Sequence, residues 1–263
     1  MIQNTKFFLN EFKDKVVLIT GGNGQIGQDI VKYYLHCEAV VINLDIEEPT
    51  HAWQSIDEKK DKLEYFIKCD ITNKDSVVQS IESVIDKFVN IDILINSAGI
   101  SVFSPFEERT CEEFTHVFDV NIKGMFLVCQ KIIQKMLKQE NKGVILNLGS
   151  IYGHTIADQR IYGDSGRNSP EIYAITKSGV TQFTKYLARY YGKDGIRVNC
   201  ISPGGIFANQ ANFFVKNYEY KTPLGRMGNP EDLIGGVAFL TSSMSIYVTG
   251  QDLIIDGGFC LGS

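Results

Sequence analysis

The chain has 263 residues, of which 44% are hydrophobic and 22% are charged, as in an ordinary globular protein. Its net charge of −5 argues against a nucleic-acid partner, because such proteins carry a clustered basic surface. Six scattered cysteines without a Cys-x-x-Cys pair argue for reduced thiols and against disulfides or a bound metal.

The first apolar patch along the chain, residues 7–9, is too short for a signal peptide or a membrane span. We therefore expect a cytoplasmic protein with no membrane partner, in which residues 1–11 form an N-terminal extension.

Short apolar runs rich in β-branched residues then alternate with segments of helical period. The predicted strands are residues 16–19, 40–44, 65–69, 91–95, 144–148, 197–201 and 253–255. Apolar residues repeat at helical spacing after the first strand (Ile26, Ile30, Tyr34) and after the third (Val77, Ile81, Val84, Ile85, Phe88), and two longer helices are predicted at 112–138 and 169–191. Strands without polar alternation are covered on both faces, and strand–helix alternation implies parallel pairing. We predict one α/β domain over residues 1–263, a Rossmann-type doubly wound, mostly seven-stranded parallel sheet with helices on both faces.

The turn after the first strand is rich in glycine and opens the first helix. Such a turn lets the backbone approach a pyrophosphate, and the helix N-terminus supplies unpaired N–H groups. The turn reads Thr20-Gly21-Gly22-Asn23-Gly24-Gln25-Ile26-Gly27.

Asp45 ends the second strand, at the spacing where an acidic residue meets the adenosine ribose hydroxyls. Its carboxylate would repel a 2′-phosphate, so NAD is favoured over NADP; the alternative is an aspartate that caps a turn. Asp70, after the third strand, is placed to reach the adenine edge.

Tyr173 and Lys177 lie four residues apart on a predicted helix, so both side chains leave the same face. A tyrosine is a poor base near neutral pH, and a neighbouring ammonium would favour its ionised form. By itself the spacing is common by chance on helix surfaces.

The order of these and other motifs resembles the short-chain dehydrogenase/reductase family, standard-length branch, over almost the whole chain. The matching pieces are 20–27, Asp70-Ile71, Asn96-Ser97-Ala98-Gly99, Asn121, Gly149-Ser150, Tyr173 with Lys177, Pro203-Gly204, 223–226 and 256–258.

The resemblance implies an NAD(P)-dependent oxidoreductase acting on CH–OH groups. Tyr173 would be the general acid/base, Lys177 would assist it and hold the nicotinamide ribose, Ser150 would bind the substrate oxygen, and Asn121 would hold a water in a proton relay. The cofactor-binding set would be Gly21, Asn23, Gly24, Gln25, Ile26, Gly27, Asp45, Asp70, Ile71, Asn96, Ala98, Gly99, Tyr173, Lys177, Pro203, Gly204 and Ile206.

Three departures from the family pattern matter. Gln25 replaces a glycine, as in the longer sugar-nucleotide-modifying branch, and we expect its amide beside the pyrophosphate. Ala208 replaces a threonine that binds the carboxamide, a role left to backbone groups of Ile206. Finally, Ser150 and Tyr173 are separated by an insertion, residues 154–170.

The insertion is polar and includes Arg160 and Arg167, which favours sugar-like or anionic substrates over lipids or steroids. The alternative is a solvated surface loop. Several motifs resemble bacterial flagellin-modification oxidoreductases of nonulosonic (legionaminic-type) acid biosynthesis: 149–153, 169–174, 201–207 and Asn209-Gln210.

The leading prediction is an NAD-dependent enzyme that interconverts a secondary alcohol and a ketone on a sugar or sugar derivative, in bacterial surface-glycan or nonulosonic acid biosynthesis. The alternatives are a sugar-nucleotide dehydratase or epimerase with tightly bound NAD, and a non-catalytic dinucleotide sensor. By resemblance the two long helices pair across an interface, which predicts a dimer or homotetramer; Phe118, Phe126, Phe183 and Tyr186 belong to that interface or to the core.

Overall fold

The computed structural model describes residues 10–49, 64–163, 165 and 167–262. The apolar patch at 7–9, and with it most of the predicted 1–11 extension, lies outside the described residues.

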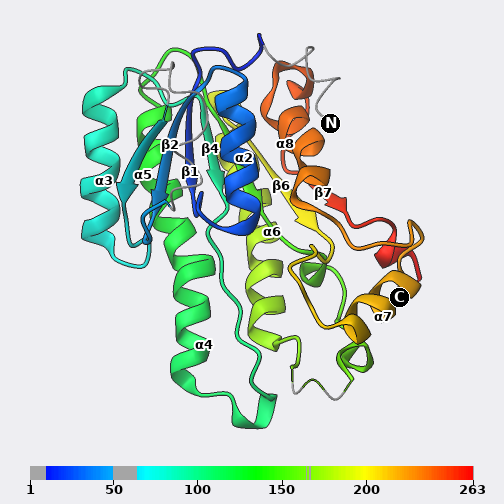
Figure 1. The fold of residues 1–263 in the computed structure, drawn as a ribbon. Helices are drawn as coiled ribbons and strands as arrows, with labels where there is room; N and C mark the ends of the chain where they lie inside the picture. The colour runs from blue at the N-terminus through cyan, green and yellow to red at the C-terminus, as the bar shows by residue number, and fades with distance from the viewer. Residues whose placement is uncertain (1–9, 50–63, 164, 166, 263) are drawn as a thin grey trace.

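Seven parallel strands form a single sheet in the order β3-β2-β1-β4-β5-β6-β7 (Figure 1). All seven predicted strands are present, with ends shifted by no more than two residues, and the predicted fold class is confirmed. Their bounds are β1 Val16–Thr20, β2 Val40–Asp45, β3 Glu64–Lys68, β4 Ile93–Asn96, β5 Val144–Leu148, β6 Arg197–Pro203 and β7 Asp252–Ile255.

Helices cover both faces of this sheet. They are α2 Gln25–His36, α3 Lys74–Lys87, α4 Cys111–Phe118, α5 Met125–Met136, α6 Glu171–Tyr191, α7 Asn212–Lys221 and α8 Ile234–Thr241. The predicted helix at 112–138 is continuous but changes to π-helical geometry over Asp119–Gly124. The last predicted helix begins two residues late, because the residue before Pro170 is disfavoured in a helix. The sequence analysis missed α7 and α8.

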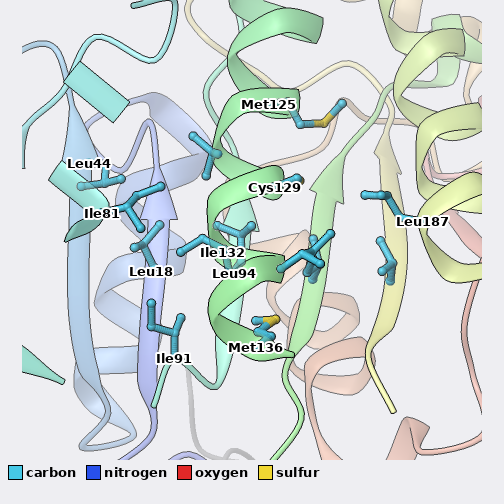
Figure 2. Packing of buried hydrophobic residues seen from close by; sticks show 14 of the residues in the cluster. Leu18, Leu44, Ile81, Ile91, Leu94, Met125, Cys129, Ile132, Met136 and Leu187 are labelled. Carbon is cyan, nitrogen blue, oxygen red and sulfur yellow. The ribbon is translucent and has the colours of Figure 1, made fainter. Parts of the chain in front are cut away.

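Two apolar layers hold the helices to the sheet. On one face α3, α5 and α6 pack over β1, β4 and β5, with Cys129, Ile132 and Met136 of α5 directed at the sheet (Figure 2). On the other face α2 and α8 pack over the same strands through a second cluster that includes Phe12, Tyr34 and Val237. Because both faces are covered, the strands are apolar throughout. No helix in the described part of the chain is long and apolar enough to cross a membrane.

The strand order reverses between β1 and β4. The segment after β1 and the segment after β4 run to opposite faces of the sheet, which leaves a crevice at the carboxyl ends of these two strands. Beyond that edge project α4, the beginning of α6, and α7 with the turns of the insertion (Figure 1). The fold therefore places the glycine turn, Ser150 and Tyr173 at one end of the sheet.

Candidate active site

The glycine turn is tight at two positions. Gly21 has φ +69°, and a Cβ there would lie 2.6 Å from the Cα atom of Ala98. A Cβ on Gly27 would lie 2.0 Å from the carbonyl oxygen of Gly21. The helix α2 that follows has no side-chain cap at Gly24 and no acidic residue in its first turn. Its first N–H groups are thus left for an anion, and this cradle fits a dinucleotide pyrophosphate.

Asp45 lies beside this turn, as predicted from its position. Its carboxylate accepts hydrogen bonds from the backbone N–H of Asn23 (2.9 Å) and of Glu47 (3.2 Å). Asp45 therefore also caps a turn, which was the alternative explanation for an aspartate at this position. Beneath the turn, the fully buried Asn43 accepts from the N–H of Gly22 at 3.1 Å and donates to the Asn23 side chain at 2.8 Å. The sequence analysis missed Asn43; a polar residue inside an apolar strand was its signal.

Gln25 makes a contact that the sequence analysis did not predict. Its Nε2 donates to the backbone carbonyl of Phe207, 2.5 Å away, in the segment after β6. The long amide side chain thus bridges from the start of α2 to the opposite wall of the crevice. The Gln25 amide thus joins two chain segments; its position beside the pyrophosphate as an extra donor stays a prediction.

Other predicted cofactor residues follow β3 and β4. The Asp70 carboxylate accepts from the N–H (2.9 Å) and the hydroxyl (2.7 Å) of Thr72, which fixes it at the strand end. Ile71 is buried against Gly124, where a Cβ would lie 2.7 Å from its side chain. Ala98 packs on the glycine turn, and Gly99 lines the cleft described below.

Asn96 is placed by the structure below the cleft. Its side chain is buried and donates to Asn147 Oδ1 at 2.8 Å and to Cys129 Sγ at 3.2 Å. Asn147 in turn donates to Thr184 Oγ1 of α6 at 2.8 Å. Through its side chain Asn96 therefore joins β4 to β5 and, through Asn147, to α6 underneath the site.

Ser150, Tyr173 and Lys177 line one cleft of about 460 Å³. Lys177 is buried, and its Nζ donates to the carbonyl oxygen of Leu148 at 2.7 Å and lies 5.5 Å from the centre of the Tyr173 ring. Ser150 follows β5, and its Oγ accepts from the N–H of Tyr152 at 3.2 Å. The structure thus brings together the three groups that the motif order predicts, from β5 and one turn of α6.

Asn121 lies in the π-helical segment, packed against the same turn of α6. Its Oδ1 accepts from the N–H of Ile100 at 2.8 Å, and its Nδ2 donates to the Ile100 carbonyl (3.0 Å) and to Thr176 Oγ1 (3.1 Å). A Cβ on Gly99 would lie 3.4 Å from Asn121 Oδ1 and 3.5 Å from Lys177 Nζ. Asn121 and Lys177 therefore border the same small space next to Gly99. π-Helical turns are frequent at functional sites.

The segment after β6 forms the other wall of the cleft. A Cβ on Gly204 would lie 2.8 Å from the Cα of Asp256, so the chain passes Pro203-Gly204 in close contact with the end of β7. The Ile206 carbonyl accepts from Gln210 Nε2 at 2.8 Å, and Gln210 Oε1 accepts from the N–H of Ala208 at 2.7 Å. The backbone around Ile206 is thereby held at the cleft.

The insertion at 154–170 is less solvated than its composition predicts. Its short turn Gln159–Tyr162 buries Ile161 and Tyr162 against α7, and the Tyr162 ring lies 5.0 Å from that of Phe214. These two apolar side chains anchor the loop. Because they are few among many polar residues, the composition of the insertion does not distinguish it from a solvated surface loop.

The remaining walls are formed by residues that the sequence analysis did not single out: Phe103, Tyr152, Phe214, Tyr218 and Met227. Burial raises the pKa of Tyr152 and of Tyr218 above the usual range, so both hydroxyls stay protonated. The Tyr218 hydroxyl accepts from the N–H of Gly205 at 2.5 Å and keeps its own proton for another partner. The cleft is aromatic with scattered hydroxyl groups.

A polar cluster lies next to the catalytic loop. His154 Nε2 is 2.8 Å from Asp252 Oδ2 of β7, which also accepts from Thr181 Oγ1 at 2.6 Å. Only 7% of the Asp252 side chain is exposed. His154 comes four residues after Ser150, and Thr181 comes one turn after Lys177. The cluster therefore connects the loop that carries Ser150 to the helix that carries Tyr173.

This arrangement matches known proteins along nearly its whole length. A family profile described as Enoyl-(Acyl carrier protein) reductase matches residues 22–260. The chain is 32% identical to 3-oxoacyl-[acyl-carrier-protein] reductase FabG of Chlamydia muridarum, over 93% of this chain and 97% of that protein. It is also 32% identical to 3beta-hydroxysteroid dehydrogenase 1 of Eggerthella lenta, over 96% of each chain.

Among solved structures, a short chain dehydrogenase from Leptospira borgpetersenii with bound NAD+ is 57% identical, with a TM-score of 0.89. The match covers 96% of this chain and 95% of that one. The chain therefore belongs to the short-chain dehydrogenase/reductase family, a family of oxidoreductases that act on CH–OH groups.

Proposed function

We propose that the protein interconverts a secondary alcohol and a ketone on a sugar or sugar derivative, with NAD as the cofactor. The observation that carries this proposal is the grouping of Ser150, Tyr173 and Lys177 in one cleft next to the glycine turn. An acid/base, a buried cation and a hydroxyl donor in contact with one cavity suit proton transfer at a carbonyl or alcohol oxygen.

In the direction of oxidation, the Tyr173 oxygen accepts the hydroxyl proton of the substrate. The buried ammonium of Lys177, 5.5 Å from the centre of the Tyr173 ring, would stabilise negative charge that develops on the Tyr173 oxygen as the proton moves. Ser150 donates a hydrogen bond to the substrate oxygen and holds it against Tyr173. Bound NAD supplies the hydride acceptor. Asn121 and Lys177 border the space beside Gly99, where a water would relay the proton to solvent.

NAD is the proposed cofactor because the Asp45 carboxylate lies at the glycine turn, where it would repel a 2′-phosphate. Gly21, Asn23, Gly24, Gln25, Ile26 and Gly27 would hold the pyrophosphate and its flanks, and Asp70 and Ile71 the adenine. Asn96, Ala98, Gly99, Pro203, Gly204 and Ile206 would line the nicotinamide half. The NAD+ bound to the Leptospira relative supports this choice.

A sugar-like substrate is supported by the walls of the cleft. The lining includes the aromatic side chains of Phe103 and Tyr152 and the hydroxyl groups of Ser101 and Ser169. Such a surface offers both apolar contact and hydrogen bonds to a compound with several hydroxyls. The named activities of the two relatives, on an acyl-carrier thioester and a steroid, are the competing substrate classes.

We further propose a cytoplasmic enzyme in bacterial surface-glycan or nonulosonic acid biosynthesis that works as a dimer or homotetramer. Association is supported by aromatic side chains left exposed on α4, α5 and α6, namely Phe118, Phe126 and Tyr186. Sedimentation showing a dilute monomer with full activity would count against the oligomer.

The experiment that tests the proposed activity is NADH formation with a panel of polyols, sugars, sugar acids, 3-hydroxyacyl thioesters and 3-hydroxysteroids. We expect turnover on a sugar-like compound and a loss of about 10²- to 10⁴-fold in Tyr173→Phe. Tyr247→Phe, at a fully exposed tyrosine remote from the cleft lining, is the matched control. Equal rates in the wild type and Tyr173→Phe would refute the chemistry. Preference for the thioester or the steroid would refute the substrate class, and NAD that stays bound without net reduction would favour a dehydratase or epimerase.

A further inference from the structure

The cleft that holds Ser150 and Tyr173 carries an unbalanced positive charge. Among its lining residues that the structure describes, Lys177 and Arg167 are cationic and none is acidic. Lys177 lies at the floor of the cleft and is bound to the Leu148 carbonyl. Arg167 comes from the insertion and lies on an outer wall. Among the described residues of the cleft, a substrate therefore meets two cations and no carboxylate.

Arg167 is held by an aromatic ring and not by an acid. Its guanidinium carbon lies 3.9 Å from the centre of the Phe103 ring, and it forms no ion pair within the described chain. Stacking on an aromatic face leaves the N–H groups at the edge of the guanidinium available to a planar or tetrahedral anion. The neighbouring segment is fixed to the same loop, since the N–H of Asn168 donates to the Phe103 carbonyl.

The other two arginines near the cleft, Arg160 and Arg109, already pair with carboxylates. Arg160, in the same insertion, pairs with Asp158 through two hydrogen bonds of 2.8 Å and does not line the cleft. Arg109 is buried, 3.4 Å from Glu171, and donates to Ser104. Of the two arginines of the insertion, only Arg167 is placed to bind substrate.

We propose that Arg167 determines specificity by binding an anionic group of the substrate while the reacting carbon lies at Tyr173. The substrate class is then a hydroxy or keto compound that also carries a carboxylate or a phosphate. Guanidinium groups bind either anion through paired hydrogen bonds, which a neutral sugar cannot match. This inference rests on the proposed oxidation of a secondary alcohol, whose substrate it makes more specific.

The test compares ligands of one carbon skeleton by calorimetry, in the presence of NADH: D-glucose, D-gluconate and D-glucose 6-phosphate. We expect at least one anionic ligand to bind the wild type about tenfold or more tightly than glucose. Arg167→Gln should remove this preference without weakening glucose, and Arg167→Lys should restore part of it. Arg160→Gln is the matched control and should bind as the wild type does.

The anion is identified by the ligand, carboxylate or phosphate, whose affinity depends more strongly on Arg167. Anionic ligands that bind wild type and Arg167→Gln equally would overturn the proposal, as would a wild type that prefers glucose. Because binding is measured without turnover, a failure of the oxidoreductase chemistry is seen separately, as a ligand that binds through Arg167 and is never oxidised.

Discussion

Replacing His154 with alanine should destabilise the protein through an effect on another residue, Asp252. A carboxylate can only accept hydrogen bonds, so His154 must present a proton on Nε2 to form its 2.8 Å contact. His154 and Thr181 both bind Asp252 Oδ2, and Asp252 Oδ1 is buried with no partner among the described residues. Without His154, one hydroxyl remains to support a carboxylate that is only 7% exposed.

The loss of unfolding free energy in His154→Ala follows from leaving the Asp252 carboxylate with too few hydrogen-bond donors. Removing one partner of a buried charge costs about 3–5 kcal/mol, and we expect the lower end because 30% of the His154 side chain is exposed to water. Asp252→Asn removes the charge but keeps an acceptor for Thr181, at a cost of about 1–1.5 kcal/mol. In the double variant no charge is stranded. Its free energy of unfolding should therefore lie above that of His154→Ala alone, with a coupling free energy of about 2–3 kcal/mol, which exceeds the cost of Asp252→Asn.

The assay is urea unfolding of the wild type, both single variants and the double variant at one protein concentration and neutral pH. His116→Ala, on the surface of α4, is the control for loss of an exposed histidine. The reasoning is refuted if the two substitutions are additive within about 0.5 kcal/mol, or if the double variant is less stable than His154→Ala.

Two further predictions concern thiols and acid. Cys111, at the start of α4, is the one exposed cysteine of six; four others are buried, and partial burial raises the pKa of the Cys260 thiol to about 12. Native protein should therefore show one fast-reacting thiol with a disulfide reagent, lost in Cys111→Ser. Two or more fast thiols would contradict this burial. Asp158 binds Arg160 and Lys221, and these two cations hold the pKa of its carboxyl group well below the usual value. The ion pairs therefore stabilise the protein at neutral pH, and this contribution is lost only as the pH falls below about 4. The difference in Tm between the wild type and Asp158→Asn should stay constant from pH 8 to 5 and shrink in stronger acid; a difference that vanishes by pH 6 would argue against the ion pairs.

Much of the fold was predictable because a parallel sheet that is covered by helices on both faces has a simple sequence pattern. Its strands are continuous apolar runs, and β5 was located to the residue. The grouping of Ser150, Tyr173 and Lys177 in one cleft was predictable because Tyr173 and Lys177 lie one helical turn apart and Ser150 follows the end of a strand. These requirements are local, so the sequence shows them directly.

Features that depend on distant partners were not predictable. Helix α8 is apolar on nearly all sides because it packs against both the sheet and its neighbour α2, so it lacks the stripe that marks a surface helix. Helix α7 has the opposite character: of its residues only Tyr218 is fully buried. The engagement of Gln25 by Phe207 joins residues far apart in the chain, and no local pattern indicates such a contact.

The π-helical turn at Asp119–Gly124 has a consequence for how the gene can vary. The wider π-turn takes up more residues per turn than an α-helix, whose residues advance by about 100° each, so one further residue inserted there would rotate α5 by about that angle relative to α4. Either the row of α5 that meets the sheet, with Ile132 and Met136, or Asn121 beside α6 would then face the wrong way. Substitutions on the outer surface of the helix should be tolerated, whereas insertion of one residue in this turn should not.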